Sequence, residues 1–109
     1  RNAAEAPCDS DFDNAARYVI STLPAPADRA GRLLKIEYRG DVARLYCNGK
    51  LLDDNFYYGR PFVYGLWRLP DDCTELELRV LPLQPDMPVY FPAEADTTPG
   101  EEVIKVEIL

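Results

Sequence analysis

Residues 40–69 decide the fold, and they read GDVARLYCNGKLLDDNFYYGRPFVYGLWRL. Val42–Cys47 has the composition of a strand, and Lys50–Leu52 can return antiparallel to it after Asn48-Gly49. Asn-Gly supplies the two positive φ angles of a type I′ turn, so the stretch predicts a β-hairpin. Because side chains alternate along a strand, one face is expected to hold Ala43, Leu45 and Cys47, and the other Val42, Arg44 and Tyr46.

The return strand is expected to lead into a loop over residues 53–61 that mixes carboxylate, amide and aromatic side chains. A pyranose stacks its C–H face on rings and pairs its hydroxyls with carboxylates, amides or guanidinium groups. A buried loop anchor needs the same rings, and we expect Phe56 and one of Tyr57 and Tyr58 to lie in the core. The residues predicted to contact a carbohydrate or a neighbouring domain are Asp54, Asn55, Tyr57, Tyr58, Arg60 and Trp67.

Apolar residues recur with a period of two in three further segments, which indicates half-buried strands. The residues expected to point inward are Leu34, Ile36 and Tyr38; Leu76, Leu78 and Val80; and Ile104, Val106 and Ile108. Two shorter strand candidates are Arg17–Leu23 and Phe62–Trp67, the second with a bulge or bend at Gly65.

Turn and loop signals separate these segments, among them the proline-rich stretch over residues 82–100. Strands spaced in this way predict an all-β fold, an antiparallel β-sandwich or jelly roll. We assign the sandwich to residues 17–109 and an N-terminal arm to residues 1–16, with a short helix expected at Asp13–Tyr18.

Length and charge narrow the function classes. The 109 residues suit one domain and are too few for a catalytic barrel of about 250 residues. The net charge of −7 argues against nucleic acid as a partner, and no apolar run approaches the roughly 20 residues that cross a bilayer. The chain begins without methionine or a recognisable secretion signal, so we interpret it as a processed product or an excised piece of a larger protein.

The three cysteines form no Cys-x-x-Cys pair and the chain has no histidine, which disfavours a structural zinc site. Cys47 alternates with Ala43 and Leu45, and this pattern predicts a small apolar core residue rather than a reactive thiol. An odd number of cysteines neither requires nor excludes an oxidising compartment.

We expect no cofactor, and a structural calcium ion is the one alternative that the sequence raises. Asp9, Asp11 and Asp13 repeat the opening spacing of an EF-hand loop, but Asn14 and Ile20 stand where its glycine and bidentate glutamate belong. We therefore predict a solvated acidic arm in which Asp13 caps the short helix.

Around the hairpin the sequence resembles the jelly-roll accessory domain of bacterial β-galactosidases of glycoside hydrolase family 35. The most specific parts are Gly40-Asp41-Val42, Asn48-Gly49-Lys50, and Asp54-Asn55-Phe56-Tyr57 with Gly59 just after. The resemblance covers roughly Arg17 to Phe91, including ELELRVLPL and Pro88–Phe91, and it leaves residues 1–13 and 93–100 unmatched.

In that family a pair of glutamates on a separate (β/α)-barrel performs catalysis, and galactose-binding-type jelly rolls pack beside the barrel. The resemblance thus implies a non-catalytic domain that packs against the catalytic domain of its own polypeptide. The location that it favours is the periplasm or the outside of the cell. The alternative is an autonomous carbohydrate-binding module that recognises galactose-type sugars through the loop. A third hypothesis is catalysis by carboxylates of this chain, and the short length of the chain disfavours it. The available carboxylates are Glu37, Asp41, Asp53 and Asp54.

Overall fold

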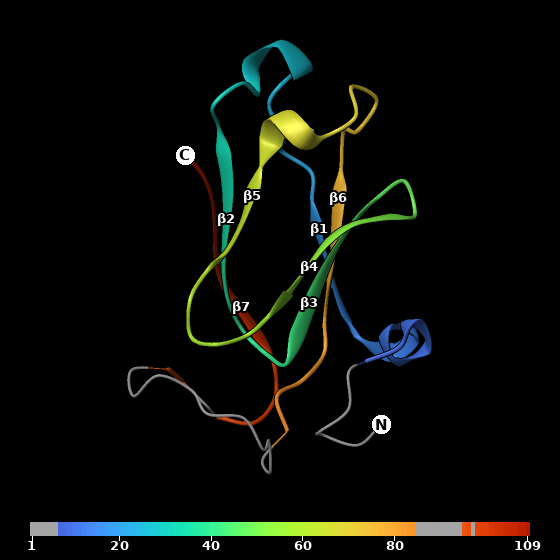
Figure 1. Cartoon of the computed structure of the whole chain (residues 1–109), viewed down its shortest axis with the longest axis vertical. Helices are drawn as coiled ribbons and strands as arrows, with labels where there is room; N and C mark the ends of the chain where they lie inside the picture. The colour runs from blue at the N-terminus through green and yellow to red at the C-terminus, as the bar shows by residue number, and fades with distance from the viewer. Residues whose placement is uncertain (1–6, 85–94, 97) are drawn as a thin grey trace.

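Two antiparallel sheets face each other in the computed structural model, which describes residues 7–84, 95–96 and 98–109 (Figure 1). Sheet A has the strand order β1-β6-β3-β4, and sheet B has the order β5-β2-β7. The strands are β1 Ala16–Ile20, β2 Leu33–Arg39, β3 Val42–Cys47, β4 Lys50–Phe56, β5 Phe62–Gly65, β6 Leu76–Val80 and β7 Glu102–Ile108. Three short 3-10 helices are η1 Asp9–Asn14, η2 Pro26–Asp28 and η3 Leu66–Arg68. The predicted all-β sandwich is confirmed.

The hairpin forms at the predicted turn. Asn48 and Gly49 have φ angles of 52° and 77°, and β3 pairs with β4 from Val42 opposite Phe56 to Cys47 opposite Lys50. The return strand is longer than expected, because residues 53–56 continue β4 rather than opening the loop. Pairing with β3 satisfies the backbone groups on one edge of this segment, and an edge strand tolerates the polar side chains that suggested a loop.

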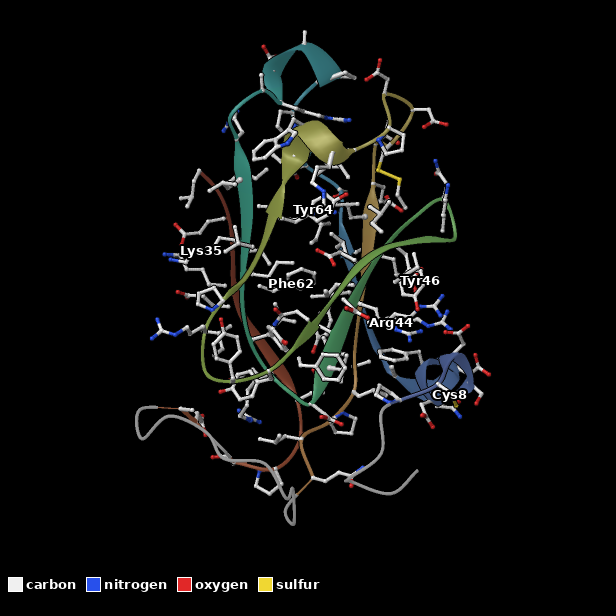
Figure 2. All side chains as sticks on the ribbon, viewed as in Figure 1. Cys8, Lys35, Arg44, Tyr46, Phe62 and Tyr64 are labelled. Atoms are coloured by element: carbon white, nitrogen blue, oxygen red, sulfur yellow. A yellow bond between two sulfur atoms is a disulfide. The ribbon has the colours of Figure 1, made fainter. Side chains whose placement is uncertain are left out.

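The core lies between the sheets and contains most of the predicted inward residues. Buried side chains from β2, β3 and β6 form it, among them Leu34, Ile36, Tyr38, Ala43, Leu45, Leu76, Leu78 and Val80. Figure 2 shows Phe62 and Tyr64 between the sheets, whereas Arg44 and Tyr46 point outward from β3. The two faces predicted for the first hairpin strand are therefore confirmed.

A disulfide joins Cys47 at the end of β3 to Cys73, three residues before β6 (Figure 2). Both residues are buried, so the prediction that Cys47 is a core residue is confirmed. Its sulfur is bonded rather than held as a free thiol, and Cys8 is an exposed free cysteine. The bond ties the turn end of the hairpin to β6.

β7 departs from the predicted alternation. Ile104 is 59% exposed, while Val103 and Ile108 pack against the core. Val106 pairs with the inward-facing Ile36 and therefore keeps the predicted face, although 39% of it is exposed. The pairing with β2 shifts so that Lys105 and Val103 face consecutive β2 residues, and Ile104 is left as the extra residue of a bulge. A one-residue shift moves the following side chains to the opposite face, which explains why Val103 rather than Ile104 points inward.

The start of the chain also differs from expectation. Helix η1 ends at Asn14 and β1 begins at Ala16, so the helix predicted at Asp13–Tyr18 is wrong. Asp13 lies inside the last turn and is not the cap; instead the backbone N–H of Cys8 donates to Asp11 Oδ2 at 2.9 Å. The η1 turn packs on the outer face of sheet A through Phe12.

The remaining short elements are the turn after β5 and the described part of the loop predicted at residues 82–100. β5 ends at Gly65 and leads into η3, so the predicted bulge is replaced by a 3-10 turn. Of the loop predicted at 82–100, the described residues include an isolated bridge between Leu83 and Gly100, and Pro88–Phe91 lies outside the described residues. Within the described ranges, no helix has the length and apolar character needed to cross a membrane.

Tyr18 links β1 to the segment before β7, and this bond makes stability depend on pH. Its hydroxyl donates to Glu101 Oε2, and that bond together with partial burial raises the pKa of Tyr18 to about 12. The unfolded chain releases this proton near its ordinary pKa of about 10. The stabilisation is therefore complete below pH 10 and is lost as the pH rises from about 10 to 12.

Urea unfolding between about pH 10 and 12 should show a smaller fall in stability for Tyr18→Phe than for the unaltered chain, because the variant lacks the hydroxyl that titrates. Equal falls would contradict the assignment of this pH dependence to Tyr18.

Candidate functional site

The loop from Tyr57 to Pro61 connects β4 to β5 and borders a pocket of 230 Å³ at one end of sheet B. The loop lines the pocket with Tyr57, Gly59, Arg60 and Pro61, and the opposite wall includes Glu37, Asp96 and Ile104. Gly59 has a φ of 88°, and a Cβ there would lie 2.6 Å from the Cβ of Ala95. Only glycine lets the loop approach the 95–96 segment this closely.

Tyr57 anchors the loop. Its ring is buried and meets Tyr38 edge to face, with 5.5 Å between the ring centroids. Its hydroxyl donates to the carbonyl oxygen of Asp96 at 2.7 Å, and burial raises the pKa of Tyr57. Tyr58 is 48% exposed, so the expectation that one of the two tyrosines is buried is confirmed for Tyr57.

The prediction for Phe56 is wrong. Its side chain is 57% exposed, because the register with β3 places it beside Val42 on the outer face of sheet A. The alternation instead turns Asn55 inward, where its Nδ2 donates to the Tyr38 hydroxyl at 2.7 Å. That hydroxyl donates in turn to the backbone carbonyl oxygen of Asn55 at 2.9 Å, and burial raises the pKa of Tyr38. The Asn55 amide is therefore engaged inside the fold.

Two carboxyl groups, those of Asp96 and Glu37, stand beside the pocket. The hydroxyl and the backbone N–H of Thr98 donate to Asp96 Oδ1 at 2.6 and 3.0 Å, and these bonds hold the pKa of Asp96 below its ordinary value. Arg39 adds to the effect, with 3.9 Å between its Nη1 and Asp96 Oδ2. Glu37 lies 3.7 Å from the ammonium of Lys35. With Arg60 on the loop, the pocket offers both donors and acceptors to a hydroxylated ligand.

The predicted site residues do not form one cluster. Tyr57 and Arg60 line the pocket, and Tyr58 is exposed on the same loop. Asp54 lies opposite Arg44 in the strand register, on the outer face of sheet A. Trp67 lies in η3, at the opposite end of β5 from the loop (Figure 1).

Sequence reasoning did not place Glu37, Asp96 or Ile104 at this site. They come from β2, from the segment after residue 94 and from the β7 bulge, and only the sandwich topology brings them to the loop. Local spacing carries no signal for such a combination, because Glu37 and the loop are far from Asp96 and Ile104 in the sequence.

The acidic arm has its own contacts. Asp9 Oδ1 accepts from Arg44 Nη1 at 2.7 Å, and Asp11 accepts from the backbone of Cys8. Among the residues that the structure describes, no group of three or more potential metal ligands occurs. The three aspartates with EF-hand-like spacing are thus placed by η1 rather than gathered around a common point.

Comparisons with known proteins find no family model, no curated protein and no solved structure that matches this chain.

Proposed function

We propose that this chain is a non-catalytic accessory β-sandwich domain of a β-galactosidase-like glycoside hydrolase and packs against the catalytic barrel of the same polypeptide. The observation that carries the docking role is a set of exposed apolar side chains on edge strand β4 and the loop after it. We call this surface the β4 face; its large apolar side chains are Leu51, Phe56 and Tyr58. The likeness around the hairpin supports the choice of parent enzyme.

Physical reasoning favours a protein contact at the β4 face. β4 pairs with β3 alone, so its other edge has no strand beside it in the described sheets. Exposed rings on an edge strand are a liability unless another surface covers them. Aromatic side chains also dominate the binding energy of protein interfaces, and domain interfaces typically bury about 600–1,500 Å². The exposed carboxylate of Asp54 would form part of the polar rim.

Hydroxyl-radical footprinting tests the docking role directly. We expect Phe56 and Tyr58 to be oxidised several times more slowly in the complete polypeptide than in the 109-residue chain. Trp67 provides the internal control and should react at similar rates in both. Equal rates for Phe56 and Tyr58 would reject docking through the β4 face, and a complete polypeptide without β-galactosidase activity would reject the parent enzyme.

The double substitution Phe56→Ser and Tyr58→Ser should separate docking from folding. Because both side chains are half exposed, the isolated chain should lose less than about 1 kcal/mol of unfolding free energy. Interface anchors contribute about 2 kcal/mol or more each, so the complete polypeptide should release this domain to proteolysis far more readily. A matched control is Val19→Ser, since Val19 is 63% exposed on β1 and away from β4. Unchanged proteolysis of the double variant would contradict the interface.

A second candidate function is recognition of galactose-type sugars, and the pocket beside Tyr57 and Arg60 favours it. One ring and a few solvated hydrogen bonds give millimolar affinity, which is about −4 kcal/mol. Such a contact becomes useful through tethering to an enzyme. Heteronuclear NMR with galactose and lactose up to tens of millimolar should shift the amides of residues 53–60 saturably. A flat titration of the folded chain would reject this candidate and leave the docking role.

A further inference from the structure

The outer face of sheet B continues from the pocket along β5. Lys35 lies between the buried Leu34 and Ile36 on β2, so its side chain points outward, as Figure 2 shows. Val63 pairs with Lys35 and shares this face, and it is 48% exposed. Glu37 is the next outward residue of β2 and also lines the pocket. The pocket therefore opens onto the face rather than standing apart from it.

Trp67 lies at the other end of this face. Gly65 pairs with the outward residue Leu33, and a Cβ on Gly65 would lie 2.6 Å from two atoms of the Trp67 ring. The indole thus rests against the backbone of Gly65, and 56% of the residue remains exposed. A ring held in this way presents a fixed apolar surface without losing further rotamer freedom on binding.

The charges on the face compensate one another. Lys35 pairs in register with Glu107, and Glu37 with Lys105. Within each strand, the ammonium and carboxylate groups are 3.7 Å apart for Lys35 and Glu37 and 3.5 Å apart for Lys105 and Glu107. An anionic or cationic ligand would meet equal numbers of both signs. A neutral ligand rich in hydroxyls can use the donors and the acceptors alike.

We propose that the outer face of sheet B binds a neutral oligosaccharide, with one sugar unit in the pocket beside Arg60 and another stacked on Trp67. Val63 and the Lys35–Glu37 pair would contact the units between them. From Pro61 to Gly65 the strand advances about 13 Å at about 3.3 Å per residue, so a single sugar unit cannot reach both ends. This inference rests on the sugar-recognition candidate and extends it from a pocket to a surface.

A peptide fits this face less well than a sugar chain. Extended peptides gain their main-chain hydrogen bonds by adding to the edge of a sheet. β2 is flanked by β5 and β7, so its backbone is already paired on both sides. The face offers side chains only: a flat ring, a short aliphatic group and compensated charges. These groups match the alternating C–H faces and hydroxyl edges of linked pyranoses.

The test is an NMR titration of the 109-residue chain with galactose, with β-1,4-galactotetraose and with a galacturonate tetramer. We expect the tetraose to bind at least tenfold more tightly than galactose and to shift the Arg60 loop, the Val63 amide and the Trp67 indole together. Trp67→Ala and Arg60→Ala should each weaken tetraose binding by about 3- to 10-fold, as expected for one ring or one hydrogen-bonded charge. Phe56→Ser, on the outer face of sheet A, is the control and should bind normally.

Gly65→Ala offers a second variant that keeps the indole but pushes it off its support. It should weaken tetraose binding while leaving galactose binding in the pocket unchanged, with circular dichroism confirming the fold. Shifts confined to the loop, with equal affinity for galactose and tetraose, would overturn the extended surface and leave the pocket candidate standing. No shifts at all would reject both, and tighter binding of the galacturonate tetramer would overturn the choice of a neutral ligand.

Discussion

Removing the disulfide by Cys47→Ala with Cys73→Ala is expected to lower the free energy of unfolding by about 3–4 kcal/mol. The cross-link spans 26 residues of sequence, and closing a loop of that length restricts the unfolded chain by about this amount. Both cysteines are buried, so the native contacts around the bond are also lost. For a domain whose total stability is about 5–15 kcal/mol, the loss is a large fraction.

Urea unfolding of the unaltered chain, the double variant and the unaltered chain in excess reductant measures this effect. The reduced chain should unfold at a urea concentration close to that of the double variant. Cys8→Ala is the matched control, since Cys8 is exposed and forms no disulfide, and it should change stability by less than about 0.5 kcal/mol. A loss below about 1 kcal/mol in the double variant would show that the cross-link adds little to the hairpin and β6 contacts.

The features of the fold that depend on local physics could be predicted from the sequence. Asn48-Gly49 supplies the backbone angles of the hairpin by itself, and the alternation in β2 and β6 follows from one face being buried. The β7 bulge could not be predicted, because it depends on the register with β2. The disulfide pairing could not be predicted either, since three cysteines allow three pairs and only the packed sheets bring two of them together.

The candidate site was predicted in part, for related reasons. The composition of residues 53–61 drew attention to the segment, but it did not reveal that β4 continues to Phe56. We expected Phe56 to be buried and Asn55 to contact a ligand or a neighbouring domain. The longer strand reverses this, because strand alternation turns Asn55 inward and Phe56 outward. Trp67 is close to the loop in sequence, yet β5 separates the two in space. Proximity along the chain is a poor guide wherever a strand intervenes.

Phe12→Ala is expected to lower the free energy of unfolding by about 3–5 kcal/mol, as for other large buried rings. Phe12 has no exposed surface and packs against Val42 and Leu81 beneath η1. The guanidinium of Arg44 lies 4.2 Å from the centroid of its ring, so the substitution also removes a cation–π contact at a largely buried arginine. Asp9→Asn is the control, since Asp9 is 96% exposed and its ion pair with Arg44 should contribute less than about 1 kcal/mol.

The outcome of that pair of substitutions, measured by thermal and urea unfolding, decides where the domain begins. A large loss for Phe12→Ala, with a small one for Asp9→Asn, would make residues 9–14 part of the sandwich, because a ring in η1 would then hold the outer face of sheet A. The predicted boundary between an arm over residues 1–16 and a domain over 17–109 would have to move toward the N-terminus. A loss below about 1 kcal/mol would instead mean that η1 detaches without cost and that the packing around Phe12 does not stabilise β3.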